Sequence, residues 1–248
     1  MDAPYELVNQ MRASILVLGP LLARYGQARV SLPGGCAIGT RPVDLHIRAM
    51  QKLGATVELA DGYIQARASK GLTGDKIVFP LVSVGATENT MMASVCASGT
   101  TQIVNAAREP EIIDLAGCLN AMGARISGHG TDTMTIEGVT SLGTAIHKVV
   151  ADRVEAGTFV MAAAMTGGRL CVRDIVPEHL DALFDVMRSA GVNIDISTDF
   201  VTVAAKDGYQ AQDVETHPYP GFPTDLQAQF TAMMCLAEGK SQISETIF

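Results

Sequence analysis

Internal repetition constrains the fold of this chain more than any other feature of its sequence. Three similar stretches, each ending in a glycine, recur about every 70 residues, at 50–54, 119–123 and 187–191. Each predicts the end of a helix, because glycine adopts the left-handed conformation of a helix C-cap without a steric penalty. An alternation of apolar and polar residues follows each glycine, which is typical of a strand with one buried face.

A second set of glycines recurs with a similar period, at positions 26, 99, 167 and 239. Each closes an alanine-rich stretch that favours helix, and each precedes a short β-prone run. Those runs lie at 29–32, 102–104, 169–172 and 241–244, and further strands are predicted at 63–66, 133–136 and 200–203. One unit is therefore helix, strand, helix, strand, turn and strand, which predicts an α/β fold. The linkers at 69–86 and 140–152 are expected to carry a further strand.

The repeat pattern breaks at both ends of the chain. The fourth unit stops at 245–248, before its second helix is expected, and the first unit begins with a helix that no strand precedes. We therefore expect the repeated architecture to be incomplete at both termini.

Composition limits the classes of partner. Of the 248 residues, 48% are hydrophobic and 18% are charged, which is typical of a globular protein. The formal net charge of -8 argues against nucleic acid as the main partner, although local arginines can still bind anionic substrates. The most apolar early run, at 13–23, is too short to span a membrane and predicts a core helix. We therefore expect no targeting signal and no membrane partner.

The five cysteines are scattered, with no pair spaced for a redox motif or a zinc site. This pattern favours reduced thiols in a cytosol and gives no reason to expect a metal. Four of them lie in predicted helices or strands, where we expect small buried side chains: Cys96, Cys118, Cys171 and Cys235. Cys36 alone stands among glycines.

The stretch at 32–46 carries the most distinctive chemistry. It reads Leu-Pro-Gly-Gly-Cys-Ala-Ile-Gly-Thr-Arg-Pro-Val-Asp-Leu-His, which places Cys36 on a polar, glycine-rich loop. Arg41 follows, and Pro42 suits the first position of a helix, where its missing N–H leaves nothing unpaired. A nearby cation and a helix N-terminus both lower the pKa of a thiol, and helix N-termini also favour anions. The loop therefore predicts an acid or a nucleophile beside an anion site.

This loop closely resembles the active-site loop of the UDP-N-acetylglucosamine 1-carboxyvinyltransferase family, and the resemblance extends over essentially the whole chain. It implies an α/β fold of repeated βαβαββ units of about 70 residues, arranged as inside-out α/β barrel lobes with the active site in the cleft. Residues 1–151, with two units and the Cys loop, would form a partial first lobe. Residues 152–248, with one and a half units, would form a partial second lobe.

The resemblance also implies an activity. The family transfers the enolpyruvyl group of phosphoenolpyruvate to the 3′-hydroxyl of UDP-N-acetylglucosamine and releases phosphate. This is the first committed step of peptidoglycan synthesis in the bacterial cytoplasm, so it serves cell-wall biogenesis, cell shape and cell division. The family needs no metal and no organic cofactor. Two parts of its site have no counterpart in this sequence, so we expect little or no turnover by this chain alone.

Roles for individual residues follow from the same resemblance. Cys36 matches the family's proton donor, which can also bond covalently to phosphoenolpyruvate. Asp225 resembles the carboxylate that receives the proton of the sugar hydroxyl. Arg12 and Arg41 match substrate-contacting arginines, which suits bidentate pairing of guanidinium with phosphate. The remaining substrate-binding positions that it implies are Pro42, Val43, Asp44, Leu45, Leu81, Val82, Ser83, Val84, Gly85 and Ile247.

Structural alternatives stay open at several of these positions. Ordinary helix and loop charges would also explain Arg12 and Arg41, and a helix-start acid would explain Asp44. His46 fits a functional histidine and a packed histidine equally well. Thr87 is a candidate N-cap for the helix expected at that point of the chain.

The same holds further along the sequence. Thr224 and Gln227 spell a capping box, which explains the turn between them without a catalytic role. Glu109 resembles an acid that lines the family's cleft, but a plain helix-start acid would look the same. Asp152 resembles a residue at the junction of the lobes. Leu81 departs from the family, which often has lysine there, and so weakens one charge contact.

Three other functions compete with this one. The shikimate-pathway enolpyruvyl transferase shares the fold, but the loop cysteine disfavours it. A non-catalytic remnant that at most binds the UDP-sugar would fit the broken repeat. A thiol redox sensor at Cys36 is the third, although no second cysteine is obviously placed to resolve an oxidised thiol.

Overall fold

The computed structural model describes residues 2–8, 11–32, 43–204 and 208–247. The chain forms two compact units, Met1–Lys148 (unit 1) and Val149–Phe248 (unit 2), and each is described by itself below. The division expected from the sequence, between residues 151 and 152, lies slightly further along the chain than this boundary.

The described residues of unit 1 form two four-stranded sheets of identical topology. The first has the order β1-β2-β4-β3, with β1 (Asp2–Ala3), β2 (Gln27–Ser31), β3 (Thr56–Ala60) and β4 (Tyr63–Arg67). The second has the order β5-β6-β8-β7, with β5 (Lys76–Val78), β6 (Thr100–Val104), β7 (Arg125–Ser127) and β8 (Thr133–Glu137). In each sheet the first pair is parallel and the other two pairs are antiparallel. The βαβαββ repeat is therefore confirmed.

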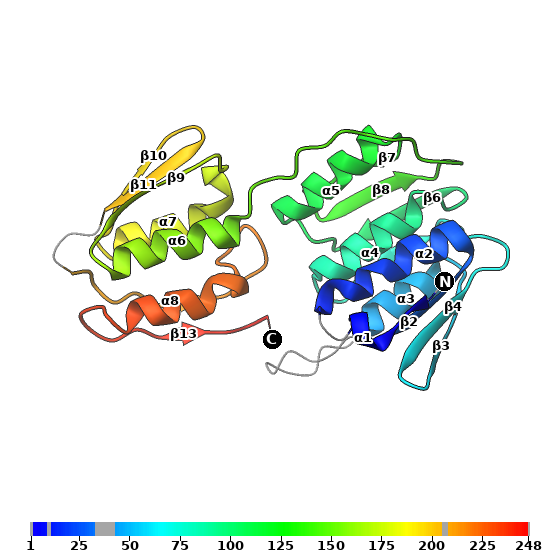
Figure 1. The fold of residues 1–248 in the computed structure, drawn as a ribbon, viewed down its shortest axis with the longest axis horizontal. Coiled ribbons are helices and arrows are strands. Elements are labelled where there is room, and N and C mark those ends of the chain that lie inside the picture. Colours follow the sequence, from blue (N-terminus) through cyan, green and yellow to red (C-terminus); the bar gives the residue numbers. More distant parts are fainter. Residues whose placement is uncertain (1, 9–10, 33–42, 205–207, 248) are drawn as a thin grey trace. The chain divides into compact units, whose positions relative to one another are not determined.

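The helices of unit 1 lie together, and the sheets lie on their outer sides (Figure 1). They are α1 (Tyr5–Val8), the 3-10 helix η1 (Arg12–Val17), α2 (Leu18–Tyr25), α3 (Asp44–Lys52), α4 (Val84–Ser94) and α5 (Pro110–Ala121). The central helix is α4, which packs against α2, α3 and α5. Its buried residues include small polar side chains as well as alanine and methionine, because neighbouring helices surround it. Helices inside and sheets outside correspond to the inside-out arrangement expected, although both sheets are open among the described residues.

Glycine ends the equivalent helix in each repeat by the same hydrogen bonds. Gly54 has φ +92°, its N–H donates to Gln51 O at 2.9 Å, and the N–H of Ala55 donates to Met50 O at 3.0 Å. This pair of bonds defines a Schellman motif. The same two bonds recur at Gly123 and Gly191, both of which have positive φ. The prediction that these glycines are C-caps is confirmed.

The strands that follow each cap form hairpins. In the first repeat the loop has two residues, Asp61 with φ 52° and Gly62 with φ 76°, between Ala60 and Tyr63. Two positive φ values define a type I′ turn, whose twist matches that of the flanking strands.

Unit 2 repeats the same plan in part. The helices α6 (Arg153–Met165), η2 (Pro177–Leu180) and α7 (Asp181–Ser189) accompany a sheet of order β10-β11-β9. Its strands are β9 (Arg169–Arg173), β10 (Asn193–Ile196) and β11 (Phe200–Ala204). A parallel pair follows, β12 (Val214–Glu215) with β13 (Ile243–Ser244), joined through η3 (Thr224–Leu226) and α8 (Gln227–Met234). The core is centred on Phe184, Phe230 and Leu226.

Three expectations about elements were wrong. A strand, β1, does precede the first helix and pairs with β2. Of the two linkers, only 69–86 carries a strand, since 140–152 forms none and exposes Ile146 fully. The run 13–23 is not one helix, because it divides into η1 and α2, with Pro20 in the first turn of α2, where a missing N–H is tolerated.

The expected burial of four cysteines was also wrong. Cys96, Cys171 and Cys235 are exposed, and Cys118 is half-buried. Cys171 occupies an outward position of β9, where exposed and half-buried residues alternate. Cys96 and Cys235 lie at or just beyond the C-terminal ends of α4 and α8. Val95 and Ala97, on either side of Cys96, are buried, so Cys96 is the outward-facing residue of that stretch.

Candidate functional site

The loop that carries Cys36, Arg41 and Pro42 lies outside the described residues, so the predicted roles of these three stay predictions. Arg12 begins η1, but its side chain is likewise not described. The other predicted residues fall into two groups. One lies at the starts of α3 and α4 in unit 1, and the other lies near the end of β13 in unit 2.

The start of α3 combines a charge with apolar anchors. Val43 is the N-cap residue and packs against the core, and Asp44 is the first residue of the helix. Asp44 forms an i,i+4 ion pair with Arg48 at 3.6 Å, and both side chains are substantially exposed. Leu45 is buried in the core. The position of Asp44 fits both a helix-start acid, which the helix dipole favours, and a ligand-contacting acid.

The start of α4 presents backbone N–H groups beside small residues. Ser83 is the N-cap, and its Oγ accepts the N–H of Ala86 at 3.3 Å. Val84 and Gly85 are the first two helical residues, whose N–H groups have no acceptor within the helix. The prediction that Thr87 is the N-cap was wrong, since it lies one turn inside the helix. Leu81 is exposed and Val82 is half-buried against the core.

Thr87 instead joins α4 to the next loop. Its side chain is fully buried, and its Oγ1 donates to Ser83 O at 2.8 Å and accepts the N–H of Ala107 at 3.0 Å. This bond fixes the loop between β6 and α5, where Asn105 has φ 60° and donates from Nδ2 to Phe79 O at 3.0 Å.

A buried polar network connects α3 and α4 with η1 and α2. Asn89, which is fully buried in α4, accepts the N–H of Gly19 on Oδ1 at 2.7 Å. This bond fixes which end of the amide is oxygen, so Nδ2 must face the other two partners. Those partners are Ile15 O, at 3.1 Å, and His46 Nδ1, at 3.0 Å.

The same network assigns the protonation of His46. Because Asn89 Nδ2 is a donor, His46 Nδ1 must be an acceptor, and the proton of the neutral ring is on Nε2. Burial lowers the pKa of His46 to about 4, and the charge of Asp44 offsets only part of this effect. The ring lies against Gly85, where an added Cβ would be 3.4 Å from Cε1 and 3.7 Å from Nε2. His46 is therefore a buried, neutral histidine packed on the start of α4.

An acidic group lies further along α4. Burial, together with the charges of Glu111 and Glu109, raises the pKa of Glu88 to about 7. Glu109 is the N-cap residue of α5 and is buried. A carboxyl with such a pKa can exchange a proton near neutral pH, which suits acid–base work in general.

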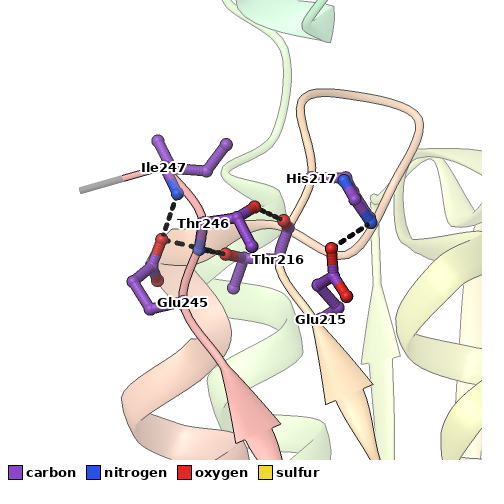
Figure 2. A network of polar contacts seen from close by, with 6 residues as sticks. All are labelled: Glu215, Thr216, His217, Glu245, Thr246 and Ile247. Atoms are coloured by element: carbon purple, nitrogen blue, oxygen red, sulfur yellow. Dashed lines mark hydrogen bonds and ion pairs between the residues drawn. The ribbon is translucent and has the colours of Figure 1, made fainter.

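In unit 2 one polar network joins the turn of Asp225, the predicted proton acceptor, to the backbone of Ile247, the predicted substrate contact. Asp225 is exposed in η3, directly after Thr224. Thr224 Oγ1 donates to Glu245 Oε2 at 2.8 Å, and the N–H of Ile247 donates to Glu245 Oε1 at 2.7 Å (Figure 2 shows the Ile247 bond). The prediction of a capping box was wrong, because Thr224 bonds Glu245 and Gln227 Nε2 bonds Thr231 at 3.3 Å.

Sequence reasoning missed Asn89 and Glu245. Asn89 had one usable signal, because it and Glu88 are the only large polar residues of a described helix that otherwise consists of small and apolar residues. Asp152 proves to be the N-cap of α6, where its Oδ1 accepts the N–H groups of Val154 and Glu155 at 2.8 and 3.0 Å.

The fold defines a class. The enolpyruvyl transferase NikO from Streptomyces tendae superposes with a TM-score of 0.82 at 24% identity, over 98% of this chain and 58% of that one. An EPSP synthase from Acinetobacter baumannii superposes with a TM-score of 0.64 at 18% identity, over 93% and 54%. The architecture is thus that of enolpyruvyl transferases.

Sequence comparison narrows the assignment from the fold to a family. The model of the family described as EPSP synthase (3-phosphoshikimate 1-carboxyvinyltransferase) matches residues 1–248, and the chain belongs to that family. It is similar to the UDP-N-acetylglucosamine 1-carboxyvinyltransferases of Gluconacetobacter diazotrophicus, at 56% identity over 247 residues, and of Agrobacterium fabrum, at 59% over 248. It spans 59% and 58% of their lengths, respectively, and nearly all of its own.

Proposed function

We propose that this chain supplies part of an enzyme that transfers the enolpyruvyl group of phosphoenolpyruvate to the 3′-hydroxyl of UDP-N-acetylglucosamine. The observation that carries the proposal is the identity of 54–59% with relatives of that name over essentially the whole chain. The Pro-Gly-Gly-Cys loop also supports it, because its sequence supplies a thiol that can donate a proton and an arginine that can bind an anion.

The reaction assigns a task to each predicted residue. The sugar oxygen bonds to carbon 2 of phosphoenolpyruvate while carbon 3 gains a proton. Carbon 3 then loses a proton, the double bond reforms, and phosphate leaves. Cys36 is the proton donor to carbon 3, and Asp225 accepts the proton of the sugar hydroxyl. Arg12 and Arg41 hold the anionic groups.

The starts of α3 and α4 are proposed to bind the nucleotide sugar in unit 1. Backbone N–H groups at a helix start favour phosphate, and those of Val84 and Gly85 have no helical acceptor. Gly85, which packs on the neutral ring of His46, suits this role because it has no side chain and so allows close approach of a ligand to its backbone. The substrate-binding positions proposed here are Pro42, Val43, Asp44, Leu45, Leu81, Val82, Ser83, Val84 and Gly85.

A second candidate substrate is shikimate 3-phosphate, because the matching family model is described by that reaction. The curated relatives favour the UDP-sugar, and so does the cysteine on the loop. We place the reaction in the bacterial cytoplasm, as a step of peptidoglycan synthesis and so of cell-wall growth and division, since the free cysteines suit a reducing compartment. Among the described residues, no helix is both long and apolar enough to cross a membrane.

Intact mass after incubation with phosphoenolpyruvate tests the assignment of Cys36. The Sγ–H group adds across the double bond of phosphoenolpyruvate, so that sulfur bonds to carbon 2 and the proton goes to carbon 3. Nothing leaves, and the mass of the protein therefore rises by the mass of one phosphoenolpyruvate molecule. We expect the adduct in the native chain and in Cys96→Ser, and not in Cys36→Ser. Cys96 is a matched control, because it is an exposed thiol whose pKa burial raises. An adduct that survives Cys36→Ser would contradict the assignment.

Calorimetric titration tests the acceptor substrate. We expect heat of binding with UDP-N-acetylglucosamine and none with shikimate 3-phosphate. The reverse result would assign the chain to the shikimate reaction, and binding of neither ligand would overturn the proposal that this chain carries a substrate site.

A further inference from the structure

Glu245, just after β13, gathers three hydrogen-bond donors from three separate segments of unit 2. Its Oε1 accepts Thr216 Oγ1–H at 2.9 Å and the Ile247 N–H at 2.7 Å, and its Oε2 accepts Thr224 Oγ1–H at 2.8 Å. Thr216 follows β12, Thr224 begins η3, and Ile247 lies two residues beyond Glu245. Figure 2 shows the bonds of Glu245 to Thr216 and to Ile247. Three donors and an acceptor-only group match an ionised carboxylate.

Thr216 anchors this carboxylate to the sheet. Its side chain is fully buried, and its N–H donates to Ser244 O at 3.0 Å, which extends the parallel ladder of β12 and β13. Its Oγ1 also accepts the Thr246 N–H at 2.9 Å, and the Thr246 hydroxyl donates to Thr216 O (Figure 2). A hydroxyl can donate once and accept as well, so all these bonds coexist.

The turn that bears Asp225 is held from both sides. On one side, Thr224 is bonded to Glu245. On the other, Leu226 is fully buried, and its N–H donates to Pro223 O at 3.1 Å. Asp225 lies between these two points and is exposed. Its backbone is therefore fixed relative to the sheet while its carboxylate faces solvent.

We propose that Glu245 is a positioning residue that holds the Asp225 turn and the Ile247 backbone in a fixed relation for the sugar end of the nucleotide-sugar substrate. It acts through Thr224 and its own chain neighbour, and not by contact with substrate. The inference rests on the proposed function, because that function gives Asp225 and Ile247 their ligand.

The experiment that tests this role compares the affinities of two ligands for four proteins. Calorimetry measures the Kd of UDP-N-acetylglucosamine and of UDP for the native chain, Glu245→Ala, Glu245→Gln and Glu215→Ala. Glu215 is the control acid. It lies next to Thr216, but its carboxylate pairs with His217 at 3.3 Å and not with Thr224 or Ile247 (Figure 2). UDP lacks the sugar, so the difference between the ligands isolates the sugar end.

We expect Glu245→Ala to weaken UDP-N-acetylglucosamine on the order of tenfold, since a small misplacement of a contacting group has large effects, and to leave UDP nearly unchanged. Glu245→Gln should restore most of the affinity, because its amide oxygen accepts from Thr216 and Ile247 while its NH₂ donates to the Thr224 hydroxyl. Glu215→Ala should match the native chain. Amide exchange at Ile247, measured without ligand, should accelerate only in Glu245→Ala.

Each other result has one meaning. Equal weakening of both ligands, or no weakening of either, would overturn the positioning role and leave the proposed function standing. A Glu245→Gln variant as weak as Glu245→Ala would assign the effect to the charge itself and overturn the inference as well. A native chain that binds neither ligand would overturn the proposed function, and the inference with it.

Discussion

Two titratable residues of unit 1, His46 and Glu88, give the stability of this protein opposite dependences on pH. His46 is buried and neutral, and its pKa falls from 6.5 to about 4, whereas the pKa of Glu88 rises from 4.5 to about 7. The stability that His46 contributes is present above its unfolded pKa and is lost as pH falls toward its folded pKa. The stability that Glu88 contributes is present below its unfolded pKa and is lost as pH rises toward its folded pKa.

The sizes of these two contributions follow from the thermodynamic linkage between proton binding and unfolding. Between about pH 7.5 and about pH 5, His46 lowers the free energy of unfolding by about 2 kcal/mol, because the unfolded chain binds a proton that the folded chain does not. Over the same interval Glu88 raises it by up to about 2 kcal/mol, after a reduction for solvent screening of a half-buried group. The two effects nearly cancel in the native chain.

Separate removal of each group should expose the other. In His46→Asn the amide oxygen can replace Nδ1 as the acceptor from Asn89, so the network persists without a titrating ring. We expect this variant to gain about 2 kcal/mol relative to the native chain on acidification over that range. Glu88→Gln should instead lose about 2 kcal/mol relative to the native chain.

Urea unfolding at the two pH values measures these differences, with pulsed hydrogen exchange of α4 peptides to identify the transition of unit 1. His217→Asn in unit 2 is the control, since that ring is 56% exposed and its loss should leave the α4 transition unchanged. A shift of the same sign in both test variants, or no difference from the native chain in either, would refute the reasoning.

Other substitutions test the polar interior of unit 1. Asn89→Ala should lower the free energy of unfolding by about 3–6 kcal/mol in urea titrations, since it leaves three buried partners unpaired; Asn120→Ala, at a half-buried site with two bonds, should cost about 1–2 kcal/mol. Thr87→Val should cost about 1–3 kcal/mol by the same assay, because a buried backbone N–H loses its acceptor, while Thr87→Ser should cost about 1 kcal/mol. Gly138→Ala should lower the thermal midpoint, because its methyl would overlap the carbonyl oxygen of Ala97; an unchanged midpoint would show that the loop yields freely.

Local signals made most of the fold predictable. The C-cap glycines and the alternating strands are encoded by neighbours in sequence, so the three Schellman motifs and the hairpin strands follow from the pattern. Strand β1 has two residues and exists through its pairing with β2, so no periodicity could reveal it. The exposure of the four cysteines could not be predicted from composition, because it depends on which face of each helix or strand is buried.

The candidate site was predictable where its residues form a local sequence motif. Ser83 and Thr87 are both capable caps, and the extended backbone of Ser83 decides between them. Glu245 carries no local signal at all, because its partners Thr224 and Thr216 are 21 and 29 residues away. Its role appears only once the strands β12 and β13 are paired.

The type I′ turn at Asp61 and Gly62 also bears on the order in which the first repeat folds. A two-residue turn brings β3 and β4 together with almost no loop to close, and hairpins form within about 1–10 μs. The parallel pair β1 and β2 must instead close a segment that contains η1 and α2. Contacts between distant residues form slowly, so we expect the hairpin to be the early kinetic step and the parallel strand to dock last.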